Sequence, residues 1–75
     1  MNFIKLTQIF ITTSRQGLTR TSRDVFVSAE KIRMIAPSSD AYIGKSFLFF
    51  DGSDETIRVL ETPEEILNIL KGAEL

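Results

Sequence analysis

The stretch that decides the fold is Thr62-Pro63-Glu64-Glu65-Ile66-Leu67-Asn68-Ile69-Leu70-Lys71-Gly72, close to the end of the chain. Thr62 can cap a helix with its hydroxyl, and Pro63 suits the first helical position, where its missing N–H needs no partner. Glu65 lies three residues after the cap, where its carboxylate can reach back to the cap's N–H. The closing Lys71-Gly72 supplies a cation for the helix dipole and a residue that tolerates left-handed geometry. The pattern predicts one short amphipathic helix over residues 62–72.

Everything before this helix has the pattern of strands. Alternating or continuous apolar residues predict strands over residues 3–11, 25–27, 45–50 and 56–60, with extended chain at 33–36. Residues 28–32 predict a single helical turn, in which the Ser28 hydroxyl accepts a hydrogen bond from a following N–H. We therefore expect an α+β fold in a single domain, residues 1–75. It consists of a small, meander-like antiparallel sheet of four or five strands with one C-terminal helix.

The predicted core combines one face of the sheet with the apolar side of the helix. Its members are Ile4, Leu6, Val25, Val27, Ile32, Leu48, Ile57, Val59, Ile66, Leu67, Ile69 and Leu70.

Residues 12–23 form a polar, basic connection between the first two predicted strands. The segment has no sustained apolar period, is rich in Thr and Ser, and carries Arg15, Arg20 and Arg23. It predicts a long hairpin connection, either as a loop or as an extension of the flanking strands. Loops of this length are often functional, so the three arginines are the candidate residues for binding a partner.

One helix of about three turns can cover only one face of such a sheet. The opposite face carries Ile9, Ile11, Phe47 and Phe49, and each aromatic side chain presents about 150–250 Å². Uncovered apolar patches that large usually mark an interface. We therefore expect these four residues to join copies of the chain in a homo-oligomer.

The composition excludes several classes of site. The chain has 75 residues with no Cys and no His, so it lacks thiolate ligands, the commonest metal ligand and the commonest general base. Gly44-Lys45-Ser46 resembles the end of a phosphate-binding loop, but Ser39 stands where that motif needs glycine. The acidic run 51–55 is too short for a calcium loop and predicts a turn. We expect no enzyme activity, no cofactor and no metal.

The start of the chain does not have the pattern of a signal peptide, and the longest apolar run, 47–50, is far too short to cross a membrane. A cytoplasmic protein without membrane insertion is the expectation.

Charge is unevenly divided along the chain. Residues 1–33 carry six basic and two acidic side chains, a net charge of +4, whereas residues 34–75 carry three basic and eight acidic ones, a net charge of −5. Such asymmetry is typical of two halves that attract each other, within one fold or between copies, or of a half that binds polyanions. An acidic protein partner for the 12–23 segment is the favoured interpretation. A nucleic-acid-binding regulator that uses the same segment is the alternative.

Three pieces of the chain together resemble the FlbD family of small flagellar and swarming-motility proteins. Residues 3–7 are similar to the family's opening strand, and residues 28–35 resemble its Asn-Ala-Asp-x-Ile-x-x-Ile segment. Residues 51–52 and 57–66 resemble its turn, last strand and final helix. Similar short reading frames also occur in mobile elements and phages. The residues themselves lead us to expect a small non-enzymatic, self-assembling interaction module. The resemblance implies a small bacterial-type protein of a β-sheet and a helix, with an accessory role in motility, mobile elements or phages.

Overall fold

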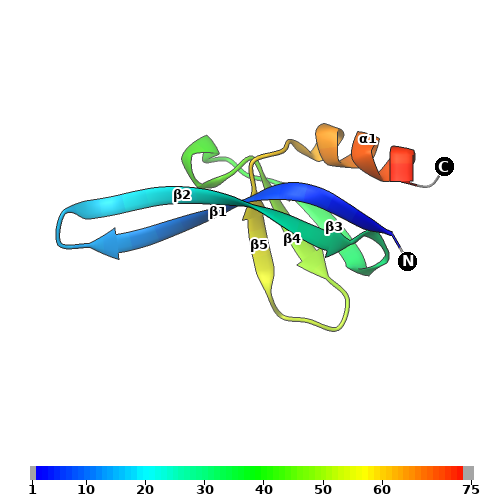
Figure 1. Ribbon diagram of the computed structural model, residues 1–75, viewed down its shortest axis with the longest axis horizontal. Coiled ribbons are helices and arrows are strands. Elements are labelled where there is room, and N and C mark those ends of the chain that lie inside the picture. Colours follow the sequence, from blue (N-terminus) through cyan, green and yellow to red (C-terminus); the bar gives the residue numbers. More distant parts are fainter. Residues whose placement is uncertain (1, 74–75) are drawn as a thin grey trace.

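The computed structural model describes residues 2–73 and confirms the α+β class, with five antiparallel strands and one helix near the C-terminus (Figure 1). The strands are β1 (Phe3–Ser14), β2 (Gly17–Ser28), β3 (Ile32–Pro37), β4 (Ser46–Phe50) and β5 (Thr56–Val59), and the helix α1 spans Pro63–Ala73. Two single turns of 3-10 helix, η1 (Ala29–Lys31) and η2 (Ala41–Ile43), flank β3.

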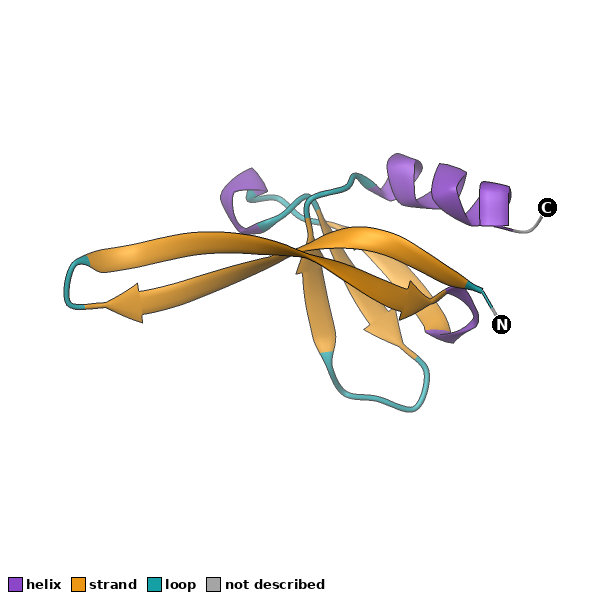
Figure 2. Ribbon diagram, viewed as in Figure 1, coloured by secondary structure: helices purple, strands orange, loops and turns teal. Residues whose placement is uncertain are grey.

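The strand order in the sheet is β2-β1-β5-β4-β3. The predicted meander is present in β3-β4-β5, but β1 then lies between its hairpin partner β2 and the last strand β5. Only Gln8 and Val59 pair in the β1–β5 ladder, and the N–H of Leu60 donates to the carbonyl of Thr7 at 2.8 Å. Because this contact is so short, the β1–β2 hairpin crosses the other three strands rather than lying beside them (Figure 2).

The core lies between the hairpin, the meander and α1. Its fully buried members are Ile4, Leu6, Leu48, Val59 and Ile66. Partly buried residues pack around them, namely Val25, Val27, Ala29, Ile32, Ile35, Phe50, Ile57, Ile69 and Leu70. Of the twelve residues predicted for the core, only Leu67 is wrong, with half of its side chain exposed (50%). The apolar stripe of α1 follows Ile66, Ile69 and Leu70 at helical spacing, and Leu67 lies one position off it.

The start of α1 has the predicted capping box. The N–H of Glu65 donates to Thr62 Oγ1 at 3.2 Å, and the N–H of Thr62 donates to Glu65 Oε1 at 3.1 Å. The end of the helix differs from the prediction, because Gly72 lies inside α1 and does not have positive φ. The helix runs on through Ala73, so Gly72 is not a left-handed C-terminal cap.

The turn η1 occurs where the sequence predicts a helical turn, but its capping differs. The Ser28 hydroxyl makes no capping hydrogen bond. Instead, the N–H of Ala29 donates to the carbonyl of Asn2 at 2.8 Å. This backbone hydrogen bond ties the turn to the start of β1.

Candidate interaction surface

The segment over residues 12–23, here called the arm, is not a loop but the outer part of a continuous β-ribbon. β1 and β2 pair residue by residue from Phe3↔Ser28 to Ser14↔Gly17, which leaves only Arg15 and Gln16 as the turn. Of the two forms that the sequence left open, the extension of the flanking strands is correct. Threonines at positions 12, 13, 19 and 21 favour strand geometry, and Gly17, at a φ of 113°, accommodates the turn.

The arm gives the molecule its elongated shape. The chain measures 46 × 24 × 20 Å along its principal axes, and the outer part of the hairpin projects well beyond the rest of the sheet (Figure 1). The β1–β5 ladder ends at Gln8. Beyond that residue, β1 pairs only with β2, and the ribbon forms no other ladder.

The three predicted partner-binding arginines occupy different positions on this ribbon. Arg15 lies in the turn, Arg20 pairs with Ile11, and Arg23 pairs with Gln8. Because successive side chains of a strand point to opposite faces, Arg20 and Arg23 lie on opposite faces of β2. The structure therefore brings the three arginines onto one projecting element but does not gather them on one face.

Two of the arginines lie over aromatic rings from outside the arm. The guanidinium of Arg23 lies 4.5 Å from the centroid of the Phe10 ring, and that of Arg20 lies 5.8 Å from the centroid of Tyr42. Residues 12–23 contain no aromatic residue, so these contacts depend on the strand register and on the position of η2. Stacking on a ring orients a guanidinium and leaves its N–H donors for a ligand.

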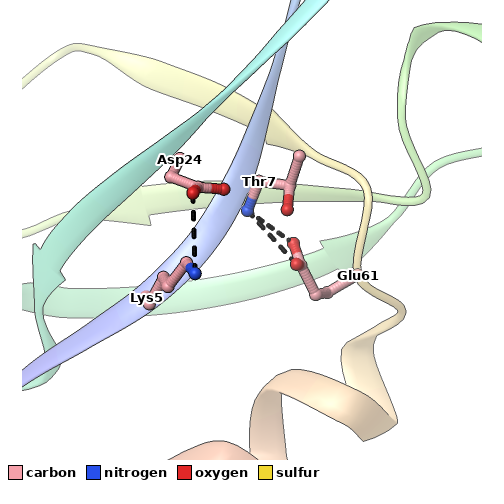
Figure 3. A network of polar contacts seen from close by, with 4 residues as sticks. All are labelled: Lys5, Thr7, Asp24 and Glu61. Atoms are coloured by element: carbon pink, nitrogen blue, oxygen red, sulfur yellow. Dashed lines mark hydrogen bonds and ion pairs between the residues drawn. The ribbon is translucent and has the colours of Figure 1, made fainter.

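The arm is electrostatically unbalanced. It contains three arginines and no Asp or Glu, and among the described residues no carboxylate lies within ion-pair distance of Arg15, Arg20 or Arg23. The nearest acid along the chain, Asp24, pairs instead with Lys5 at 3.5 Å (Figure 3). The predicted attraction between the two halves of the chain is thus not used to neutralise the arm within one molecule.

The four predicted interface residues fall into two groups. Ile9 is 3% exposed, so the expectation that it is uncovered is wrong. β1 contacts η2, and Tyr42 of that turn lies against Arg20. Arg20 pairs with Ile11 across the ladder, and Ile11 lies on the same face of β1 as Ile9. We attribute the burial of Ile9 to this turn. Ile11 is only half-buried.

Phe47 and Phe49 lie on the face of β4 opposite the buried Leu48, as predicted, and both are half-buried. Met34, the ladder partner of Phe49, is 46% exposed and extends this apolar face onto β3. Sequence reasoning missed Met34 because the pairing of β3 with β4 sets its position.

Glu61 has a structural role. Both of its carboxylate oxygens accept the N–H of Thr7, at 2.9 and 3.2 Å, directly beyond the end of the β1–β5 ladder (Figure 3). Its carbonyl accepts the hydroxyl of the fully buried Ser46 at 2.8 Å. Gly44-Lys45-Ser46 leads into strand β4 rather than a helix, so it lacks the geometry of a phosphate-binding loop.

Within residues 2–73, no group of three or more acidic, His or Cys side chains is arranged to hold a metal ion. No helix in the same range has the length and apolar character needed to cross a bilayer. Comparisons with protein-family models, with curated proteins and with solved structures find no match for this chain.

Proposed function

We propose that this protein is a non-enzymatic, self-assembling interaction module whose arm binds an acidic protein partner. The observation that carries the proposal is the arm itself, a β-ribbon that projects from the body with three arginines and no acid. A ribbon restricts its side chains before binding, so less conformational entropy is lost when a partner docks. Arginine donates in a fixed fork that matches a carboxylate.

The charge of the whole chain favours an acidic protein over a generic polyanion. The formal net charge is −1, so the body outside the arm carries a net charge of −4. Such a body repels a long polyanion such as nucleic acid, whereas a compact acidic patch on a protein can meet the projecting arm alone.

The arm's contribution is tested by substituting Arg15, Arg20 and Arg23 with alanine and measuring partner recovery by affinity capture and mass spectrometry. The matched control replaces three exposed cations of the body, Lys31, Arg33 and Lys71. We expect the arm variant to lose partners that the wild type and the control retain, with circular dichroism unchanged. Equal recovery by all three proteins would remove the arm from the proposed function.

Nucleic-acid binding is the second candidate, and the ribbon geometry favours it. A two-stranded antiparallel ribbon has dimensions that enter the major groove of DNA, and arginines on both faces could contact phosphates. Fluorescence anisotropy with labelled duplex DNA across a salt series tests this candidate. Binding should weaken linearly in log–log terms as counterions compete, and binding that is absent or insensitive to salt rejects it.

Self-assembly is the other part of the proposal, and the apolar face of Met34, Phe47 and Phe49 supports it. The accessory role in motility, mobile elements or phages that the FlbD resemblance implies is a narrower form of the same proposal. Light scattering across a concentration series tests assembly directly. A chain mass of 8.5 kDa at every concentration would contradict it.

A further inference from the structure

The outer edge of β2 is a free strand edge of unusual length. β2 has 12 residues and lies at the end of the strand order, so only β1 pairs with it. Among the described residues, its backbone makes no backbone hydrogen bond outside that ladder. The only side-chain donors to it in that range come from β1, whose Thr12 and Ser14 hydroxyls donate to the carbonyls of Thr19 and Gly17. Exposed edges of this kind are templates for pairing with another strand, and proteins commonly use them to bind peptides or copies of themselves.

We propose that β2 pairs antiparallel with β2 of a second copy, about a two-fold axis at Ser22. In this register Arg20 of one copy lies opposite Asp24 of the other, and Leu18 lies opposite Phe26. The symmetry makes each contact twice. All five residues lie on one face of β2, so the paired side chains meet on the same side of the extended sheet.

Exposure within one chain supports this pairing. Leu18 is 62% exposed and Phe26 is 68% exposed, so the register buries two of the most exposed large apolar side chains against each other. The Asp24 carboxylate uses only Oδ2 for Lys5, at 3.5 Å. Arg20 lies 5.8 Å from the Tyr42 ring, near the outer limit of a cation–π contact. Both charged groups are therefore able to meet a partner.

Neighbouring registers are less favourable. A two-fold axis perpendicular to the sheet keeps the same face of both copies on the same side. The axis must therefore lie between the two copies of one residue of β2, which sets that residue opposite itself. An axis at Arg20, Arg23 or Asp24 sets two like charges directly opposite each other. An axis at Thr21 sets the apolar Leu18 against Asp24. Only the axis at Ser22 sets Arg20 opposite Asp24 and Leu18 opposite Phe26.

This inference rests on the self-assembly in the proposed function and names the surface that performs it. The decisive experiment is a charge exchange between Arg20→Asp and Asp24→Arg, measured by light scattering and sedimentation at low salt. Each single variant opposes like charges at two symmetry-related positions, so its dissociation constant should rise roughly tenfold to a hundredfold. An equimolar mixture restores both opposite-charge pairs and should recover the heterodimer.

The matched control is Arg23→Asp, which makes the same charge change three residues away on the other face of β2. A heterodimer of this variant with Asp24→Arg has only one opposite-charge pair, so it should be weaker than the heterodimer of Arg20→Asp with Asp24→Arg, which has two. Thermal unfolding of each variant confirms that it folds. A mixture that assembles no better than its components overturns the inference.

A covalent test uses the absence of cysteine from the chain. Ser22→Cys places two thiols opposite each other at the axis, where cross-strand Cβ atoms are about 4.5–5.5 Å apart, and mild oxidation should give a disulfide-linked dimer. Ser14→Cys, far from the axis, should not crosslink above background.

The outcomes separate this inference from the proposed self-assembly. If the wild type assembles, and assembly is unchanged by the edge variants but lost in Phe49→Glu, only this inference is overturned. A wild type that is monomeric overturns it together with self-assembly, and leaves arm-dependent partner recovery as a separate result.

Discussion

At the scale of single residues, polar side chains form hydrogen bonds with backbone groups near the short β1–β5 pairing. β5 ends at Val59, and the Glu61 carboxylate then accepts the Thr7 N–H that a longer strand would have bonded. The Ser46 hydroxyl, fully buried, satisfies the carbonyl of the same glutamate. These two hydrogen bonds hold the segment that joins the sheet to α1, and their removal should be costly because buried partners are left without a bond.

We therefore expect Ser46→Ala to lower the free energy of unfolding by about 1–3 kcal/mol, since it removes the hydroxyl that bonds the part-buried Glu61 carbonyl. Ser39→Ala, at an exposed position between β3 and η2, is the control and should change stability by less than about 0.5 kcal/mol. Urea denaturation followed by circular dichroism measures both. Equal stability of the two variants would mean that water replaces the Ser46 hydroxyl.

The capping box predicts a dependence of stability on pH. The pKa of Glu65 is lowered, first by its hydrogen bond from the Thr62 backbone N–H and second by the Thr62 side chain. A carboxyl with a lowered folded-state pKa stabilises the fold above its unfolded pKa, and this contribution is lost as the pH falls through the folded value. Acidification below about pH 4.5 should therefore weaken α1, and Glu65→Gln should flatten that part of the profile. Thermal melts from pH 3 to pH 7 compare it with Glu64→Gln, whose carboxylate has no such role, and parallel profiles would contradict the assignment.

At the scale of elements, local chemistry was predictable and strand pairing was not. Both ends of the Thr62–Glu65 capping box lie within four residues, so the start of α1 follows from sequence alone. The apolar alternation of Ile4 and Leu6 likewise predicts their burial. The arm was ambiguous because its threonines favour strands, while its lack of a sustained apolar period is typical of loops. The position of β1 beside β5 depends on one pair, Gln8 with Val59, separated by most of the chain.

The same reasoning explains the candidate surface. The three arginines were predictable as a basic segment, but their distribution over two faces follows from the β1–β2 register. Ile9 is buried, and β1 contacts η2, which is far away in sequence. The exposed edge of β2 becomes visible only when the strand order is known.

At the scale of the whole molecule, the core lies in the body, and the proposed binding surface lies on the arm. Every residue of the buried core cluster, and every partly buried residue that packs on it, lies outside residues 12–23. Gly44, in the body, has a φ of 126°, and a Cβ there would approach the Val59 carbonyl at 3.0 Å, so this position requires glycine. The packing that stabilises the core therefore involves the body and not the arm.

Removal of the outer arm should therefore leave a folded protein. Ile11 and Arg20 are directly opposite ladder partners, so residues 12–19 can be replaced by Asn-Gly, which favours the tight turn of a two-residue hairpin. We expect the melting temperature to change by only a few degrees, because the core keeps all its contacts. Ile66→Ala in the full chain is the contrast, and it should lower the free energy of unfolding by about 2–5 kcal/mol by opening a cavity in the core.

The shortened chain also loses Arg15 and Leu18, so partner recovery and pairing of β2 should both fall while the fold persists. A shortened chain that fails to fold would show that the ribbon stabilises the body, and the arm could then no longer be regarded as an element set apart for binding.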